Sequence, residues 1–240
     1  MVIAGRIKHV FTPDTGGLIL VDKPLGWTSF DVVKKIRGAM RSVVRRRNFK
    51  VGHAGTLDPL ATGLLILAYG PFTKKLPEIT GQEKVYTGTM TLGATTPSYD
   101  GETEPVAGGE WRHLQEKHIR EVMDRHIGEV MQRPPLYSAK RHEGERGYHL
   151  ARGGASIEMP PVKVIISRLD LLDLLDGQLR FEVHVSKGTY IRSLAHDIGQ
   201  ELGCGAYLST LRRTAIGTYQ VEDALSPMEW AEHIAPLKER

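Results

Sequence analysis

Residues 52–69 read GHAGTLDPLATGLLILAY, and this stretch decides the fold. Its second half, Leu64 to Tyr69, is an apolar run short enough to be a buried strand. Its first half, residues 52–63, contains three glycines and one proline and therefore predicts a loop. A polar loop thus leads directly into a core strand, and the acidic residue in that loop is Asp58.

The segment before this loop predicts a strand, a turn and a helix. Residues 17–22, GLILVD, are typical of a short buried strand, which Lys23-Pro24-Leu25-Gly26 ends because proline cannot continue a ladder. Thr28 and Asp31 form a capping-box pattern that predicts the start of a helix. Apolar residues then recur at helical spacing, namely Phe30, Val33 and Ile36.

The rest of the chain contains more predicted strands than helices. Alternating patterns predict strands at 84–92, 162–172 and 179–186, with Tyr86 on the apolar face of the first. Periodic apolar residues predict helices near 119–127 and over 190–202, the second ended by Gly203. Because the strands occur in adjacent runs, we expect an α+β fold with a mixed, mainly antiparallel sheet flanked by helices.

Composition describes a globular chain of 240 residues with a formal net charge of +4. The single cysteine, Cys204, excludes an intrachain disulfide and a multi-cysteine metal site, and favours a reducing compartment. No segment approaches the ~20 apolar residues of a membrane span, so we expect a cytoplasmic protein without membrane association. Residues 32–57 contain eight lysines and arginines and no acid, which fits either a polyanion footprint or a solvated basic surface.

Familiar catalytic motifs are missing, and Asp58 is the residue of interest. There is no GxxxxGK[ST] loop, no HExxH helix and no GxSxG elbow, and the histidines lack paired ligand spacing. Pro59 holds the backbone of Asp58 extended, so its carboxylate can project from a stiff loop. Taken alone, an Asp-Pro pair more often only organises a turn.

Two cations are candidate partners of that carboxylate. Arg192 lies in the first turn of the predicted 190–202 helix, where the helix dipole disfavours a cation, so an anion is expected nearby. An arginine exposed to solvent explains this position equally well. Lys23 is either a second active-site cation or only a turn lysine.

Together these segments resemble the TruB family of tRNA pseudouridine synthases. The resemblance rests on five blocks in the family's order and spacing, across roughly residues 17–225: LVDKPLGWTSFDVVKKIR (20–37), VGHAGTLDPLATGLLILAYG (51–70), KVYTGTMTLGATTPSYDGE (84–102), QRPPLYSAKRHEGERGYHLARGG (132–154) and VSKGTYIRSLAHDIGQELGCGAYLSTLRRTAIGTY (185–219).

The resemblance implies three catalytic residues: Asp58 of GTLDP as the catalytic carboxylate, Arg192 of YIRS as its partner, and Tyr86 as the aromatic ring that stacks on the flipped uracil. An extruded base loses its neighbours in the RNA, and an aromatic face can replace that stacking.

It also implies a set of substrate-binding residues. His53 and Tyr190 would line the RNA pocket, and Leu211 would pack beneath the target base. Arg213 would contact RNA or support its own loop, and Lys23 would brace the active site.

The implied reaction isomerises a uridine, at position 55 in the T loop of tRNA, by base flipping and without a cofactor or metal. We expect a pseudouridine synthase fold with a central RNA-binding cleft, a monomer, and the T stem-loop of tRNA as partner.

Two departures from the family are Lys140 and Arg141 in SAKR, and the apparent lack of a PUA domain. We therefore expect a catalytic domain over 1–225 and a short tail over 226–240. Without a PUA domain, the protein would bind tRNA through this catalytic domain and its basic 34–50 segment. A synthase acting on another RNA, or a non-catalytic RNA-binding or RNA-folding module, remains an alternative.

Overall fold

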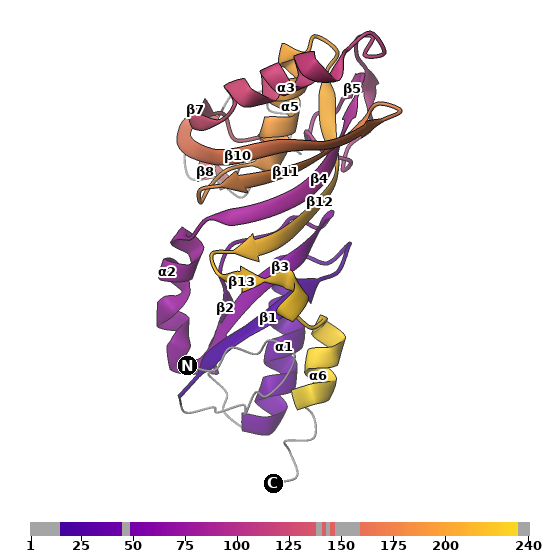
Figure 1. The fold of residues 1–240 in the computed structure, drawn as a ribbon. Coiled ribbons are helices and arrows are strands. Elements are labelled where there is room, and N and C mark those ends of the chain that lie inside the picture. The colour runs from indigo at the N-terminus through magenta and orange to yellow at the C-terminus, as the bar shows by residue number, and fades with distance from the viewer. Residues whose placement is uncertain (1–14, 45–48, 138–140, 143–144, 147–158, 235–240) are drawn as a thin grey trace. The chain divides into compact units, whose positions relative to one another are not determined.

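The structure, a computed structural model, describes residues 15–44, 49–137, 141–142, 145–146 and 159–234. The chain divides into two compact units, residues 1–86 with 212–240 (unit 1) and residues 87–211 (unit 2). Strands β4 (Lys84–Leu92) and β12 (Ala206–Ile216) have residues in both units (Figure 1).

The other elements of unit 1 are β1 (Gly17–Lys23), α1 (Ser29–Val44), β2 (Val51–His53), β3 (Ala61–Tyr69), the 3₁₀ helix η1 (Gly70–Lys75), α2 (Leu76–Gly81), β13 (Tyr219–Gln220), η2 (Val221–Asp223) and α6 (Pro227–Ile234). Unit 2 contains β5 (Ala94–Thr95), β6 (Val106–Ala107), α3 (Glu116–Arg125), β7 (Gly128–Gln132), β8 (Arg141–His142), β9 (Glu145–Arg146), β10 (Val162–Leu175), β11 (Gln178–Val185) and α5 (Ile191–Glu201).

The core of unit 1 is built around two antiparallel strands, β1 and β3, which are buried on both faces. Their register runs from Gly17 opposite Tyr69 to Lys23 opposite Gly63. One face packs against α1 and α6, and the other packs near α2 (Figure 1). Since alternate side chains of a strand point to opposite faces, a strand covered on both sides must be apolar at nearly every position. The unbroken run Leu64 to Tyr69 therefore forms a buried strand, as predicted.

Helix α1 begins where the capping box predicts. The backbone N–H of Thr28 donates to Asp31 Oδ2 at 3.0 Å, and the N–H of Asp31 donates to Thr28 Oγ1 at 3.0 Å. The expectation that Phe30 belongs to the apolar face is wrong, because its side chain is 62% exposed. The buried face consists instead of Ser29, Val32, Val33, Ile36 and Met40. Phe30 precedes Val32 by two residues, which corresponds to a rotation of about 200° around a helix, so its side chain points away from the buried face.

The described part of unit 2 combines an antiparallel sheet with two amphipathic helices. Strand β10 pairs with β11 on one side and with β7 on the other, both antiparallel. Helix α3 packs against β10 and α5. The strands at 84–92, 162–172 and 179–186 and the helices near 119–127 and 190–202 were all predicted. These pairings and the α+β architecture confirm the predicted mixed, mainly antiparallel sheet.

Residues 226–240, expected to be a short tail, include helix α6. Trp230 is 3% exposed, and its indole N–H donates to the carbonyl of Leu20 at 2.7 Å. Helix α6 is therefore part of the core of unit 1. Within the described ranges, no helix is both long enough and apolar enough to span a membrane.

Candidate active site

Asp58 lies on the loop between β2 and β3, and Ser29 anchors this loop to the start of α1. The Ser29 hydroxyl donates to the carbonyl of Leu57 at 3.0 Å and accepts from the N–H of Leu57 at 2.8 Å. The carbonyl of Asp58 itself accepts from the N–H of Ala61 at 3.0 Å. The loop backbone is fixed on both sides of Asp58, whose side chain is half-buried.

Lys23 is a fully buried lysine beside this loop. Its ammonium donates to the carbonyls of Trp27 at 2.6 Å, Pro24 at 3.0 Å and Pro59 at 3.4 Å. Burial lowers the pKa of Lys23 to about 8, while the nearby carboxylate of Asp58 opposes this shift. Lys23 thus joins the turn after β1 to the Asp58 loop and places a positive charge near the Asp58 carboxylate. The interpretation of Lys23 as only a turn lysine is therefore incomplete.

The lowered pKa of Lys23 predicts a pH dependence of stability. Above pH 8 the folded protein loses this proton, while the unfolded chain keeps it until its ordinary value of 10.5. The unfolded state then binds more protons, so the contribution of Lys23 to the free energy of unfolding rises with pH across this window. We expect the stability difference between wild type and Lys23→Met, measured by urea unfolding from pH 7 to 9.5, to move in favour of wild type. Parallel pH profiles for the two proteins would contradict this.

Arg213 supports the same loop from β12, and its side chain is only 1% exposed. Its guanidinium donates to the carbonyls of Leu64 at 2.7 Å, Gly55 at 3.1 Å and Thr56 at 3.5 Å. A buried charge is stable only when its donors are satisfied, and three backbone carbonyls satisfy most of them here. Arg213 was predicted to contact RNA or to support its own loop, but its segment is strand β12, and the loop that it supports is the one that carries Asp58. Its contact with RNA stays a prediction.

The ring of Tyr86 lies beside Arg213. Its hydroxyl accepts from Arg213 Nη1 at 3.4 Å, and the guanidinium carbon is 5.9 Å from the ring centroid, within the range of a cation–π contact. Tyr86 is 8% exposed and lies on the same side of β4 as Met90 and Leu92, as predicted. Arg213 therefore fixes both the Asp58 loop and the aromatic ring predicted to stack on the substrate base.

His53 ends strand β2 five residues before Asp58 and is half-buried. Burial lowers its pKa, and the positive charge of Arg213 lowers it further. Its imidazole is therefore neutral near pH 7. Unit 1 thus brings His53, Lys23, Tyr86 and Arg213 together around the loop that carries Asp58.

Gly63, a residue of β3, allows β12 to lie close to the strand that follows the Asp58 loop. Gly63 has φ of 101°, and a Cβ atom added there would lie 2.2 Å from the carbonyl oxygen of Arg213. Only glycine fits at this position, because other residues rarely adopt this conformation and would clash with the neighbouring strand.

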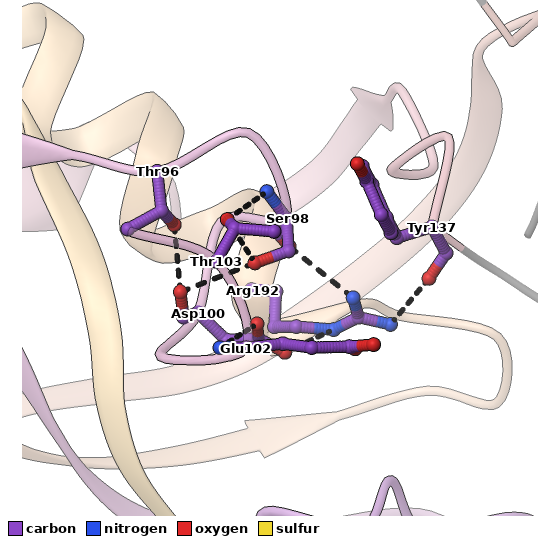
Figure 2. Close-up of polar contacts among 7 residues, drawn as sticks. All are labelled: Thr96, Ser98, Asp100, Glu102, Thr103, Tyr137 and Arg192. Carbon is purple, nitrogen blue, oxygen red and sulfur yellow. Dashed lines mark hydrogen bonds and ion pairs between the residues drawn. The ribbon is translucent and has the colours of Figure 1, made fainter. Parts of the chain in front are cut away.

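Arg192, predicted to need an anion, is 5% exposed in unit 2 and contacts Asp100 (Figure 2). Its Nε lies 3.5 Å from Asp100 Oδ2, and its Nη1 and Nη2 donate to the carbonyls of Ser98 at 3.2 Å and Tyr137 at 3.0 Å. The alternative of a solvent-exposed arginine is wrong. The pairing of Arg192 with Asp58 stays a prediction, because the two residues belong to different units.

Tyr190 and Leu211 also lie in unit 2. Tyr190 is the N-cap residue of α5, and its backbone exchanges two hydrogen bonds with the side chain of Gln132, at 2.8 and 3.0 Å. Leu211 is a half-buried residue of β12. Their predicted contacts with RNA remain predictions.

Sequence reasoning missed Ser29, which holds the Asp58 loop in unit 1, and it missed Asp100 and Gln132, which hold Arg192 and Tyr190 in unit 2. The acidic, turn-rich segment after β4 was a visible signal for Asp100, since a buried arginine in a first helical turn needs an anion. Ser29 and Gln132 carried no signal, because each bonds to a residue far away in the sequence.

Other predictions concern residues outside the described part. Arg45, Arg46, Arg47 and Lys140 lie there. The same holds for most of residues 138–150, which the resemblance to the TruB family implies to be an RNA-facing loop, and the side chain of Arg141 is not described. Cys204 is buried and unpaired with any other cysteine, as its being the single cysteine requires. Within the described residues, no group of three or more His, Cys, Asp or Glu is arranged to hold a metal ion.

Comparisons with known proteins cover nearly the whole chain. Residues 41–191 match the family model "TruB family pseudouridylate synthase (N terminal domain)", and residues 192–235 match "tRNA pseudouridylate synthase B C-terminal domain". A protein of Flavobacterium johnsoniae named tRNA pseudouridine synthase B is 47% identical over 88% of this chain and 92% of its own length. One of the same name from Bacteroides fragilis is 43% identical over 91% of this chain and 94% of its own length.

Among solved structures, a chain of a Cbf5-Nop10-Gar1 complex has a TM-score of 0.69 and 30% identity. The match covers 93% of this chain but 56% of that one. Together with the matched family models and the named relatives, this likeness shows the fold of the pseudouridine synthases. From the matched family models and these relatives, the chain belongs to the TruB family of pseudouridylate synthases.

Proposed function

We propose that this protein isomerises uridine 55 in the T loop of tRNA to pseudouridine, with Asp58 as the catalytic carboxylate. The observation that carries this proposal is the loop of Asp58, which Ser29, Lys23 and Arg213 hold in place beside the ring of Tyr86. The names of the relatives, tRNA pseudouridine synthase B, support the substrate and the reaction.

The reaction needs only groups that the chain supplies. The bond between uracil N1 and ribose C1′ breaks, the base turns within the pocket, and a new bond joins C5 to C1′. The proton on C5 is lost and a proton is gained at N1, so the product is an isomer of the substrate. A fixed carboxylate assists either by attacking the ribose or by attacking the uracil ring. Lys23 and its neighbours keep that carboxylate aimed, which is a large part of its catalytic use.

Tyr86 provides the aromatic surface that an extruded uracil needs after leaving the RNA stack. Leu211 supplies an apolar floor, and His53 and Tyr190 line the pocket. Arg192 is the ionic partner that keeps Asp58 charged. Within unit 2, the carboxylate of Asp100 holds Arg192. The catalytic domain extends past residue 225 to include helix α6, which packs in the core of unit 1, and it binds the T stem-loop as a monomer.

A direct test treats unmodified tRNA with purified protein and maps pseudouridines before and after. We expect one new pseudouridine at position 55, and none in a transcript whose T-loop uridine is replaced by cytidine. Modification at a different site or only in another class of RNA would overturn the assignment of substrate, and no modification in any RNA would leave the non-catalytic module as the better account.

We expect activity to survive exhaustive dialysis against a metal chelator, provided the tRNA is already folded. The chemistry above uses a carboxylate and no Lewis acid. The measurement is tritium release from C5 of uracil in a prefolded T-loop transcript. A strict requirement for an added divalent ion under these conditions would contradict the proposal.

Reversal of Arg45, Arg46 and Arg47 to glutamate should weaken tRNA binding and flatten its salt dependence, while saturating tRNA still turns over. Each phosphate contact contributes roughly 0.7 to 0.9 to the slope of log K against log salt, so the loss of three is measurable. The control variant carries the same charge change on β10 and β11, at Lys163, Arg168 and Arg180. Equal binding by both variants would show that the run at 45–47 is only a solvated surface.

A further inference from the structure

The loop 96–103 in unit 2 supplies two of the groups that hold Arg192. These are the carbonyl of Ser98 and the carboxylate of Asp100 (Figure 2). Asp100 uses its other oxygen, Oδ1, to accept from the N–H of Glu102 at 3.0 Å. The direction of the Arg192 guanidinium therefore depends on the conformation of this loop.

Bonds within the loop fix its turn. Thr96 Oγ1 donates to the carbonyl of Asp100 at 2.7 Å, and Ser98 Oγ donates to the same carbonyl at 3.2 Å. The N–H of Ser98 donates to Thr103 Oγ1 at 3.1 Å. These contacts close the loop on itself (Figure 2) but leave open what holds it against helix α5, where Arg192 resides.

Tyr99 stands between Ser98 and Asp100 in an unusual backbone conformation. Its φ is 63°, one of two positive values among the described residues other than glycine. A tyrosine in this left-handed region is unfavourable unless its surroundings compensate, and such residues tend to occur at functional positions. Its carbonyl accepts from the N–H of Leu208 at 2.9 Å, which ties the loop to β12.

The ring of Tyr99 stacks on the imidazole of His196. Their centroids are 3.9 Å apart and the ring planes differ by 16°. His196 follows Arg192 by four residues on α5, so both side chains lie on the same face of the helix. The loop is therefore held by the same helix face at two points, through Arg192 and through His196. Burial lowers the pKa of His196, so the ring stacks as a neutral imidazole near pH 7.

We propose that Tyr99 and His196 are positioning residues, whose stacked rings hold the 96–103 loop on α5 so that Ser98 and Asp100 aim the guanidinium of Arg192. Neither ring acts on the substrate. This proposal rests on the proposed function only through the role of Arg192 in catalysis. The contacts that it explains lie entirely within unit 2.

The test compares variants that keep a ring with variants that lose it. Tyr99→Phe and His196→Phe keep the stack. Tyr99→Asn removes the ring but tolerates a positive φ, and His196→Leu keeps an apolar side chain without a ring. We expect the ring-less variants to lower kcat on tRNA by roughly 10- to 100-fold, with little change in tRNA affinity, because small displacements of a positioned group have effects of this size. The phenylalanine variants should stay within about threefold of wild type, on the same grounds.

Three further results decide the proposal. The double variant Tyr99→Asn with His196→Leu should be no slower than the slower single variant, because the two rings act as one unit. The amide protons of Ser98 and Glu102 should exchange faster with solvent in the ring-less variants than in the phenylalanine variants. Trp111→Leu, which removes another aromatic ring of unit 2, should leave kcat and these amides unchanged.

Equal kcat in ring-less and ring-retaining variants would overturn the proposal, as would additive effects in the double variant. If wild type forms no pseudouridine in tRNA, the proposed function fails instead. The amide exchange rates then still decide whether the stack holds the loop, since they do not depend on activity.

Discussion

Replacement of Asp58 by asparagine is expected to abolish pseudouridine formation, while tRNA binding and the folded structure persist. Asparagine has the size and shape of aspartate, and the loop contacts of Ser29 and Lys23 are made to backbone atoms that the substitution does not change. An amide cannot act as a nucleophile or base at this position, so the loss should be at least about 10³-fold in kcat. Tritium release from C5 of uracil measures turnover, and filter binding measures affinity for tRNA.

The control is Asp223→Asn, which removes the same charge from an exposed position in unit 1. It should behave as wild type in both assays. Turnover by Asp58→Asn above one per cent of wild type would remove Asp58 from the chemistry and restore the simpler interpretation, in which this aspartate only organises a turn.

Replacement of Arg213 by methionine should lower both stability and turnover. Methionine fills much of the same space, but the carbonyls of Gly55, Thr56 and Leu64 lose their buried donor. A buried acceptor left without a partner costs ~1–3 kcal/mol, so the free energy of unfolding should fall by at least about 3 kcal/mol. Urea unfolding measures this loss. Turnover should fall as well, because the Asp58 loop and Tyr86 both lose their common support.

Arg212→Met is the matched control, at the adjacent residue of the same strand. Arg212 pairs with Asp22 at 2.7 and 3.0 Å, but both side chains are more than one third exposed to solvent. Exposed ion pairs contribute about 0–1 kcal/mol, so this variant should unfold nearly as wild type does. Equal destabilisation by the two variants would mean that the buried contacts of Arg213 are not what stabilises the loop.

Much of the fold follows from local sequence. The capping box of Thr28 and Asp31 set the start of α1, and strict alternation identified β11. Strand β12 was not predicted, although it carries Leu211 and Arg213. Its segment, AYLSTLRRTAI, mixes polar and basic residues where a core strand would be apolar. Its burial pattern depends on neighbours distant in the sequence, and β-propensity depends strongly on such neighbours.

The residues of the candidate site likewise divide into those that the sequence alone predicted and those that it did not. Sequence alone singled out Asp58, Arg192 and Lys23, because an aspartate held extended by proline and a cation at a helix start are local features with local causes. Resemblance to the TruB family added Tyr86, His53 and the remaining residues. For Arg192 the sequence offered two equal explanations, a nearby anion or exposure to solvent, and it did not identify Asp100 as the anion.

The sequence by itself determined the strand and loop around Asp58, the helix that begins after Thr28, and the family. It left open whether Arg192 pairs with an anion or is exposed to solvent, and the structure decided this through the contact with Asp100. Tertiary structure alone decided that Arg213 is buried under the Asp58 loop, that Ser29 anchors this loop, and that Tyr99 stacks on His196. The physical reason is that backbone conformation depends on neighbours along the chain. The partners of a buried charge or ring are chosen by packing among segments that the sequence keeps far apart.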